Sequence, residues 1–570
     1  MVFNKYLLPT ILALTLLLSC ATTDTSPDLI IYNADIYTVD KENPTATAVA
    51  IKDEEIISIG MDEAIKKLAT ESTELLDLKG AFMMPGFIEG HAHFTGLGYS
   101  LLNLNFLRSK SWEEIVEMVE EKVKESEPGE WIVGRGWHQE KWDSVPHQHV
   151  GGYPTHEQLS EISPNNPVVL THASGHGLFA NAKAMQISGV SLETADPKGG
   201  AIVRNEEGEA IGVFEERAMS VIRAAHEEYL ETLSEEEKEK TWYKAVELAQ
   251  EECLTKGVTS FQDAGASFVE VDRFEKIALA GEFELRLWTM IRRSAKEMKG
   301  KLAGIRKVNV GNNYYTCRAI KTEVDGALGS YGAWLLEPYD DKPDFYGQNT
   351  TDIEEVEQIA ELAAANDMQM CVHAIGDRAN REVLDIMERT FEKIDGKDLR
   401  WRIEHSQHIN VADIPRFAEL NVIAAMQGIH CTSDALFAEK RLGERRAREE
   451  AYPWRSLLDA GVVVNNGTDA PVEDVNPLES YYASVTRKRV DNGYTFFPEQ
   501  KMTREEALHS YTLANAYSAF EEDLKGSLEV GKLADMVVLS KNLISCSEPE
   551  LLETEVLYTF VGGELKYRKY

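Results

Sequence analysis

The chain is poor in cysteine and in basic residues. Its 570 residues include only six cysteines, none of them in a CxxC pair, so we expect mostly buried thiols rather than a disulfide framework. Lys and Arg number 59 against 96 Asp and Glu, a net charge of −37 that a phosphate backbone would repel. This balance argues against nucleic-acid binding. With 43% hydrophobic residues, the composition predicts a large soluble chain with a substantial core.

The N-terminus has the features of an export signal. Lys5 precedes an apolar run at residues 6–18, which is shorter than the roughly 20 residues of a membrane-spanning helix. The run ends in LLSC at residues 17–20, which resembles a bacterial lipobox. We therefore predict a signal peptide at 1–20, lipidation of Cys20, a tether at 21–28 and an exported protein anchored to the bacterial cell envelope. An ordinary signal peptide with an incidental cysteine is the alternative.

Both ends of the mature chain are rich in short β-patterns. Alternating apolar residues with Asp and Gly between them fill residues 29–78, and a similar pattern occupies 526–542 and the residues that follow. Neither segment is long enough to bury a face by itself. We predict that residues 29–80 and 522–570 combine into one small β-sandwich domain.

Between the two ends, short apolar strands alternate with helical patterns. This order predicts an α/β fold, a (β/α)8 TIM-like barrel over 81–521 whose chemistry lies at the C-terminal ends of the strands. An open doubly wound sheet is the alternative. Residues 95–250 are too long for one connection, and we expect a large insertion after strand 1 that shapes the substrate pocket. The predicted strands cover residues 81–90, 258–265, 284–290, 319–327, 368–374, 401–406, 422–428 and 462–470.

Several histidines and one aspartate fall where the predicted strands end. His91 and His93 end the first strand, and residues two apart on a strand point to the same side. His373 and His405 end the fifth and sixth strands, and Asp469 ends the eighth. Imidazole and carboxylate ligate zinc and similar ions, and catalytic sites keep one position open for water. Each residue alone could be structural, but their common position predicts a metal site.

Lys321 lies in the fourth predicted strand and has two interpretations. A plain ammonium is a poor metal ligand because it is positively charged. Carbamylation by carbon dioxide would convert it into a carboxylate that can bridge two ions. Alternatively, Lys321 is neutralised by Asp325 or Glu323.

Several motifs resemble those of one enzyme family. MMPGFIEGHAH, KTEVDGALGSYGAW, CVHAIGDRAN, RIEHSQHI and NNGTDAPVEDVNPL are similar to motifs of the metal-dependent amidohydrolases, in particular the amidohydrolase 3 (YtcJ-like) branch. THASGHGLFANAKAM, GRGWHQEKW and GSLEVGKLADMVVL extend the resemblance, which runs from about Leu29 to the C-terminus. It implies one or two divalent ions, with zinc expected, and allows a homodimer. The metal-site positions that it implies are His91, His93, Lys321, His373, His405 and Asp469.

The same resemblance suggests substrate-binding residues within the insertion. His176 lies in the SGHGLFAN motif, and Trp137 and His138 lie in GRGWHQEKW. The family usually has Asp where this chain has Glu89, and often Asp where it has His138. The first departure leaves the metal site intact, whereas the second makes the substrate harder to transfer.

The resemblance and the predicted site together indicate hydrolysis of a C–N bond in an amide, a cyclic amide or an N-acyl compound. A divalent ion lowers the pKa of its bound water towards about 7 and so supplies hydroxide at neutral pH. Asp469 would take and return the proton, and His176 would donate to the oxyanion. An ester or lactone is a chemically similar substrate. The alternatives are a metal-dependent deaminase or isomerase on the same barrel and a lipid-anchored, non-catalytic binding protein.

Overall fold

The structure is a computed structural model that describes residues 26–394 and 397–569. The predicted signal peptide and Cys20 lie outside the described residues, so the export signal and the lipid anchor stay predictions. In residues 26–394 and 397–569, no helix is both long and apolar enough to cross a membrane.

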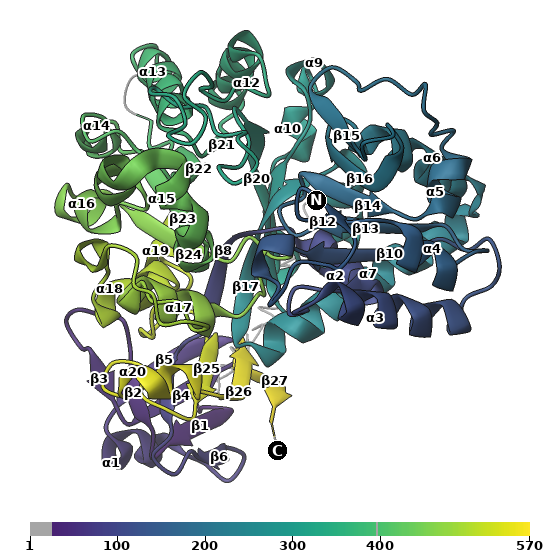
Figure 1. Cartoon of the computed structure of the whole chain (residues 1–570). Helices are drawn as coiled ribbons and strands as arrows, with labels where there is room; N and C mark the ends of the chain where they lie inside the picture. Colours follow the sequence, from purple (N-terminus) through teal and green to yellow (C-terminus); the bar gives the residue numbers. More distant parts are fainter. Residues whose placement is uncertain (1–25, 395–396, 570) are drawn as a thin grey trace, which may run out of the picture.

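Eight parallel strands form the nearly closed central barrel of the molecule (Figure 1). The predicted TIM-like α/β fold is therefore confirmed. β19 (Lys307–Asn309) pairs antiparallel with β20 at the side of this sheet. The barrel strands, in their order around the sheet, are β8 (Phe87–Ala92), β17 (Val258–Ala266), β18 (Arg286–Ile291), β20 (Tyr315–Glu323), β21 (Gln369–Ala374), β22 (Arg402–His405), β23 (Ile423–Gln427) and β24 (Val464–Gly467).

Side chains join the first and last strands of the barrel. The Asn515 amide donates to the carbonyl oxygens of Ile88 and Asn466, at 2.6 and 2.8 Å. The Glu89 carboxylate accepts hydrogen bonds from the backbone N–H and the hydroxyl of Thr468. Glu89 thus connects β8 to the end of β24, next to the predicted metal ligands.

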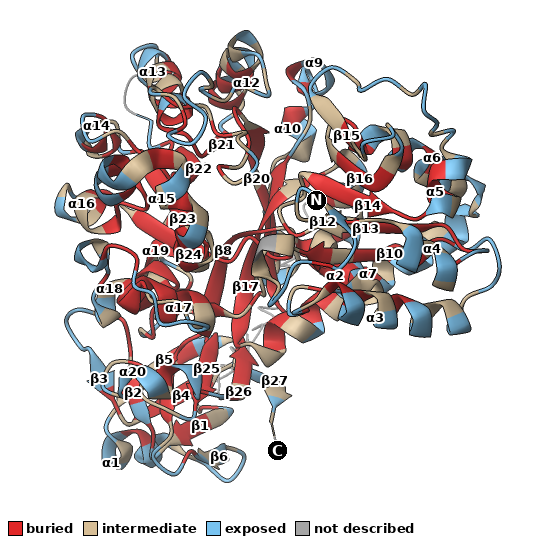
Figure 2. Ribbon diagram, in the orientation of Figure 1, coloured by how far each residue is buried: buried red, intermediate tan, exposed pale blue. Residues whose placement is uncertain are grey.

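Helices surround the barrel on its outer side. In Figure 2 the barrel strands are buried, while helices such as α12 and α13 expose their outer faces. Parallel barrel strands are covered on both sides, and β18 and β23 are accordingly mostly apolar, whereas β22 and β24 are buried but mostly polar. The helices that follow β18 in the barrel include α12 (Ile353–Ala365), α13 (Asp377–Phe391), α14 (Ile414–Glu419), α15 (Gly428–Glu450), α16 (Trp454–Asp459), α17 (Pro477–Thr486), α18 (Arg504–Ser510) and α19 (Leu513–Ser518).

The strand predicted over 81–90 is two strands in two different sheets. β7 (Phe82–Pro85) pairs with β25 and β2, whereas β8 belongs to the barrel. The chain passes from one sheet to the other at Gly86, where a Cβ atom would lie 2.3 Å from the Thr259 side chain. Both strands are buried, so their apolar run is continuous and gives no sign of the change of sheet.

The two ends of the chain meet in a pair of small sheets at the bottom of Figure 1. One has the order β5-β4-β1-β6 and the other β27-β26-β25-β7-β2-β3. A shared apolar cluster includes Ile36 and Val49 from the N-terminal part and Met536 and Phe560 from the C-terminal part. The strands are β1 (Leu29–Tyr32), β2 (Asp35–Tyr37), β3 (Thr45–Ala46), β4 (Ala48–Lys52), β5 (Glu55–Gly60), β6 (Glu74–Asp77), β25 (Met536–Leu539), β26 (Val556–Val561) and β27 (Glu564–Arg568).

A separate six-stranded sheet lies between β8 and β17 in sequence, to the right of the barrel in Figure 1. Its order is β15-β16-β14-β13-β10-β9, and it has apolar cores of its own. We call residues 103–233 the insertion. The predicted range of 95–250 is wider, because α2 (Phe94–Leu102) and α7 (Glu235–Thr255) pack on each other and on β17 of the barrel. The strands are β9 (Leu104–Asn105), β10 (Ile132–Trp137), β13 (Val168–His172), β14 (Gly177–Ala180), β15 (Gly200–Arg204) and β16 (Ala210–Glu216).

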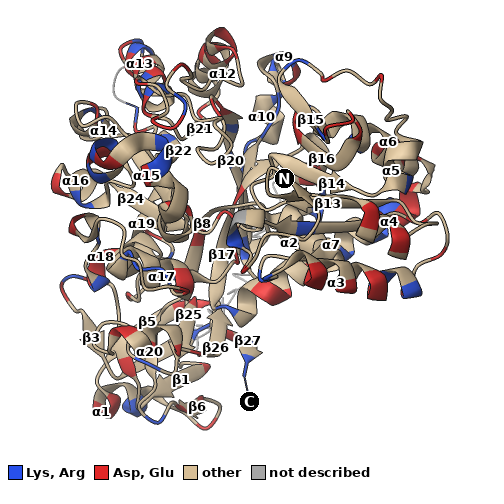
Figure 3. Cartoon of the chain, in the orientation of Figure 1, with Lys and Arg blue, Asp and Glu red and all other residues tan. Residues whose placement is uncertain are grey.

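The acidic surplus is visible on the helices of the insertion. α3 (Trp112–Glu125) buries Trp112, Ile115 and Val119 and carries mostly acidic residues on its other side (Figure 3). This amphipathic pattern explains why a chain with so much negative charge still forms a packed core.

Candidate metal centre

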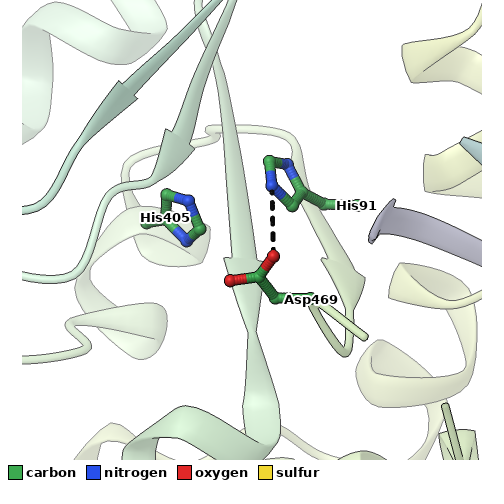
Figure 4. A group of neighbouring side chains, drawn as sticks. All are labelled: His91, His405 and Asp469. Carbon is green, nitrogen blue, oxygen red and sulfur yellow. Dashed lines mark ion pairs between the residues drawn. The ribbon is translucent and has the colours of Figure 1, made fainter. Parts of the chain in front are cut away.

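Three of the predicted ligands converge at the C-terminal end of the barrel (Figure 4). His91 comes from β8, His405 from the end of β22, and Asp469 from the second residue after β24. One ligand atom of each lies within 4.8 Å of the others, and all three residues are buried. The Nε2 atom of His91 is 3.7 Å from Oδ1 of Asp469. The three elements are far apart in sequence, and the barrel brings their ends together.

His93 and His373 lie beside this group. The Nε2 atom of His93 is 3.3 Å from Oδ1 of Asp469, and its side chain is 35% exposed. The ring of His373 has its centre 4.4 Å from that of His405. The barrel thus brings all four predicted imidazoles and the aspartate to one mouth.

Lys321 is buried in β20, which pairs with β21, the strand that carries His373. Burial lowers the pKa of its amine, and Arg292 lowers it further. Of the two carboxylates that we considered as its neutralising partners, Glu323 pairs with Arg292 instead. Asp325 accepts hydrogen bonds from three backbone N–H groups. Carbamylation of Lys321 remains a prediction.

A buried ion pair orients His91. Nδ1 of His91 is hydrogen-bonded to the Glu404 carboxylate, and Arg402 holds that carboxylate through its Nε at 2.7 Å and its Nη2 at 3.0 Å. Burial raises the pKa of Glu404, but Arg402 and His91 outweigh it, and the pKa lies well below its usual range. A charged Glu404 accepts a hydrogen bond from the N–H of Nδ1, so Nε2 carries the lone pair that faces the centre.

His405 is oriented in a similar way by a neutral group. Its Nδ1 lies 2.8 Å from Oε1 of Gln427, the last residue of β23. Because an amide oxygen accepts, Nδ1 carries the hydrogen and Nε2 remains free to ligate. Sequence reasoning missed Glu404, Arg402 and Gln427. Glu404 stands next to His405 in the RIEHSQHI motif, which was the available signal, whereas nothing marked Gln427.

Unsatisfied buried atoms show that the group fits a divalent cation. Nε2 of His91, Nε2 of His373 and Oδ1 of Asp469 are buried without a hydrogen-bond partner among the residues that the structure describes. Nε2 of His373 lies 3.7 Å from Oδ1 of Asp325, whereas the other two atoms face each other at 3.7 Å. Buried polar atoms are almost always paired, so the unpaired Nε2 of His91 and Oδ1 of Asp469 indicate a position for a bound ligand. Two or more imidazoles and a carboxylate are the donors that zinc and its neighbours take.

The backbone is strained at two of the converging residues. His405 has a φ of 73° and Asp469 a φ of 59°, left-handed conformations that non-glycine residues rarely adopt. Such conformations cost of order 1 kcal/mol each and cluster at functional sites. Burial raises the pKa of Asp469, but His93, His405 and His91 outweigh it and hold the carboxyl ionised.

The three predicted residues of the insertion have different surroundings. Trp137 is 1% exposed, and its indole N–H donates to the carbonyl oxygen of Leu170 at 2.8 Å inside the insertion core. Burial lowers the pKa of His138 to about 3. These placements favour packing for Trp137 and a neutral imidazole for His138.

His176 is placed on the barrel side of the insertion. Its Nδ1 is 3.0 Å from the Glu216 carboxylate, and its side chain is 29% exposed. Burial lowers the pKa of His176, but Glu216 outweighs it, so the pKa is raised. The charge of His176 also acts on His373 at the barrel mouth. His176 is thus a hydrogen-bond donor near the predicted ligands.

Comparison with known proteins gives matches along nearly the whole chain. A sequence model of the amidohydrolase family matches residues 74–567. The LONG AFTER FAR-RED 3 protein of Arabidopsis thaliana is 31% identical over 95% of this chain and 91% of its own length. The YtcJ protein of Bacillus subtilis is 29% identical over 94% and 98%. The N-substituted formamide deformylase of Arthrobacter pascens is 28% identical over 95% and 98%.

A solved structure shares the same architecture. The crystal structure of an uncharacterized metal-dependent hydrolase from Pyrococcus horikoshii superposes with a TM-score of 0.73 at 26% sequence identity. The alignment covers 91% of this chain and 99% of that one.

Proposed function

The chain belongs to the amidohydrolase family, as its motifs predicted, and on this premise we propose that it is a metal-dependent hydrolase of a C–N bond. The substrate that we propose is a small amide, cyclic amide or N-acyl compound. The name of the formamide deformylase relative describes hydrolysis of this bond type in a protein of similar length.

One observation carries the proposal. His91 Nε2 and Asp469 Oδ1 are buried, face each other at 3.7 Å and have no hydrogen-bond partner within the described part of the chain. Glu404 orients the imidazole of His91 and Gln427 orients that of His405, so that the free nitrogens of both rings face the same point. A site that only packed the barrel would not need oriented imidazoles beside an ionised carboxylate.

His91, His405 and Asp469 would hold the cation, with His93, His373 and Lys321 beside them. A divalent cation bound there supplies an activated water and polarises the substrate carbonyl. Asp469 accepts a proton from the attacking water and delivers it to the departing nitrogen, as a positioned carboxylate can. His176, protonated by its pairing with Glu216, donates a hydrogen bond to the oxyanion.

The test is elemental analysis of the purified protein, followed by hydrolysis assays on N-formyl, N-acyl and cyclic amides with and without a chelator. We expect one or two divalent ions per chain, and release of amine or acid that stops with the chelator and returns with metal. Asp469→Asn should lower kcat by about 10²–10⁴-fold, because the proton has no acceptor.

Two results would contradict the proposal. Protein without a divalent ion and unaffected by the chelator would exclude the metal centre. Ammonia released from a ring amino group by a one-metal enzyme, with no amide cleaved, would favour a deaminase, one of the two alternatives on this barrel.

A further inference from the structure

Three basic side chains of the insertion contact one short segment of the barrel. We call residues 468–476, between β24 and α17, the β24 loop, and it begins with Thr468 and Asp469. Arg135, Lys141 and Arg108 reach this loop or the first turn of α17 from the insertion. The insertion therefore touches the segment that carries the proposed proton acceptor.

Arg135 binds the loop backbone directly. It lies in β10, and its Nε donates to the carbonyl oxygen of Pro471 at 3.2 Å, while Nη2 donates to that of Ala173 at 2.9 Å. These two bonds fix the guanidinium between the insertion and the loop. No carboxylate lies within ion-pair distance of Arg135 among the described residues, although the charge of Asp469 acts on it. A charged hydrogen bond of this kind is stronger than a neutral one.

Lys141 and Arg108 bind the acidic side chains of the loop. Nζ of Lys141 lies 3.3 Å from Oε1 of Glu473 and 3.3 Å from the hydroxyl of Ser433. Nη2 of Arg108 lies 2.8 Å from Asp474 and 2.8 Å from Glu479. The side chain of Lys141 is 30% exposed and that of Arg108 is 70% exposed, so water and salt weaken the second contact more.

Apolar packing does not fill the gap between insertion and loop. A cavity of about 230 Å³ lies there, lined by residues that include Leu107, Arg108, Pro471 and Asp474. Because the cavity removes close contacts, polar bonds contribute more to holding the loop here than they would at a packed interface.

The barrel holds the same loop from the opposite side. The N–H of Asp469 donates to the carbonyl oxygen of His91 at 2.8 Å, and the N–H of His93 donates to that of Ala470 at 2.7 Å. The loop is thus bound by β8 on one side and by Arg135 on the other. A shift of the Pro471 carbonyl would move Asp469, because only Ala470 separates them.

We propose that the insertion positions Asp469 by holding the β24 loop, with Arg135 as the main positioning residue and Lys141 and Arg108 as weaker ties. The inference rests on the role proposed for Asp469 in the reaction. In this proposal the insertion helps to set the geometry of the barrel site, in addition to the pocket-shaping role expected from the sequence.

Hydrogen–deuterium exchange of the full chain, prepared free of metal, tests the positioning itself. The peptides to follow cover residues 464–476. In this segment the backbone N–H groups of Asp469 and Val472 are hydrogen-bonded and report on its opening. We expect about 10-fold faster exchange in Arg135→Gln, a smaller increase in Lys141→Met, and in Arg108→Gln a change below about 3-fold that disappears at high salt. Lys124→Met is the matched control, because Lys124 pairs with Glu121 on the outer helix α3.

Activity provides a second readout. Arg135→Gln should lower kcat by about 10-fold with little change in KM, and Arg135→Lys should recover part of the loss because an ammonium can still donate to Pro471. Loop exchange in Arg135→Gln equal to that in Lys124→Met would overturn the proposal, as would a loss confined to KM. If Arg135→Gln does not fold, Arg135→Lys and Lys141→Met answer the same question. The exchange experiment uses neither metal nor substrate, so its outcome is independent of the proposed reaction.

Discussion

The barrel and the insertion each hold a close pair of histidines, buried in the barrel and half-buried in the insertion, and the two pairs have different chemistry. The ring centres of His91 and His405 are 4.7 Å apart, and those of His138 and His172 are 4.5 Å apart. The barrel pair faces Asp469 and is backed by Glu404. The nitrogens of His172 meet the neutral groups of Ser174 and Gln139.

The difference shows that crowding of imidazoles does not make a metal site by itself. Burial lowers the pKa of His91 and of His138 alike. At His91 the charges of Glu404 and Asp469 oppose that effect and outrank the opposite charge of Lys321, whereas at His138 the charge of Lys141 adds to it and outranks the opposing charge of Glu473. A cation is therefore stabilised by two carboxylates at the barrel pair, whereas the insertion pair has no carboxylate hydrogen-bonded to its rings among the described residues.

The strongest test of this comparison removes the charge behind the barrel pair. Glu404→Gln should weaken divalent-metal affinity by about 10- to 100-fold, the usual effect of losing the group that orients a ligating histidine. Metal titration of the metal-free protein gives the affinity. Gln139→Leu, which removes the amide behind the insertion pair, is the control and should leave the affinity unchanged. Equal affinities in the two variants would break the comparison.

His408, a buried histidine of the barrel with no carboxylate beside it in the part of the chain that the structure describes, refines the comparison between the two histidine pairs. His408 is 1% exposed, both its ring nitrogens lack a hydrogen-bond partner in the described ranges, and burial lowers its pKa to about 3. In the unfolded chain His408 is protonated below about pH 6.5, whereas in the folded chain it stays neutral down to about pH 3. The free energy of unfolding is therefore highest above pH 6.5 with respect to this group, and it decreases as the pH falls from 6.5 towards 3. The slope is about 1.4 kcal/mol per pH unit.

Urea unfolding at several pH values between 7 and 4 measures this slope. His408→Gln should flatten the dependence by about one proton, and an unchanged slope would mean that His408 is protonated in the folded chain. Together, the His408→Gln and Glu404→Gln variants separate the effect of burial on a histidine from the effect of a nearby charge.

The smallest expected effect concerns Trp137 in the insertion. Trp137→Phe removes the hydrogen bond to Leu170 and should lower the free energy of unfolding by about 1 kcal/mol. Its kcat/KM should stay within about 3-fold of the unchanged protein. Denaturant unfolding and steady-state kinetics measure the two quantities. A large loss of activity without a loss of stability would instead support the substrate-binding role that the motif resemblance implied for Trp137.

The sequence predicted the barrel and the set of residues at its mouth for one physical reason. Strand ends are local features, because apolar runs and the residues that terminate them are adjacent in the chain. His91, His93, His373, His405 and Asp469 could therefore be assigned to strand ends before their distances were known. The change of sheet at Gly86 and the true extent of the insertion were missed, because neither alters the local pattern of apolar residues.

By itself, then, the sequence determined the fold class, the family and the ring of donors at the strand ends. Only the tertiary structure decided which partner each donor has. Glu404 orients His91 across 313 residues of chain, and Arg135 reaches Pro471 across 336. Such contacts depend on how strands and inserted sheet are placed in three dimensions, and no periodicity along the chain records that placement.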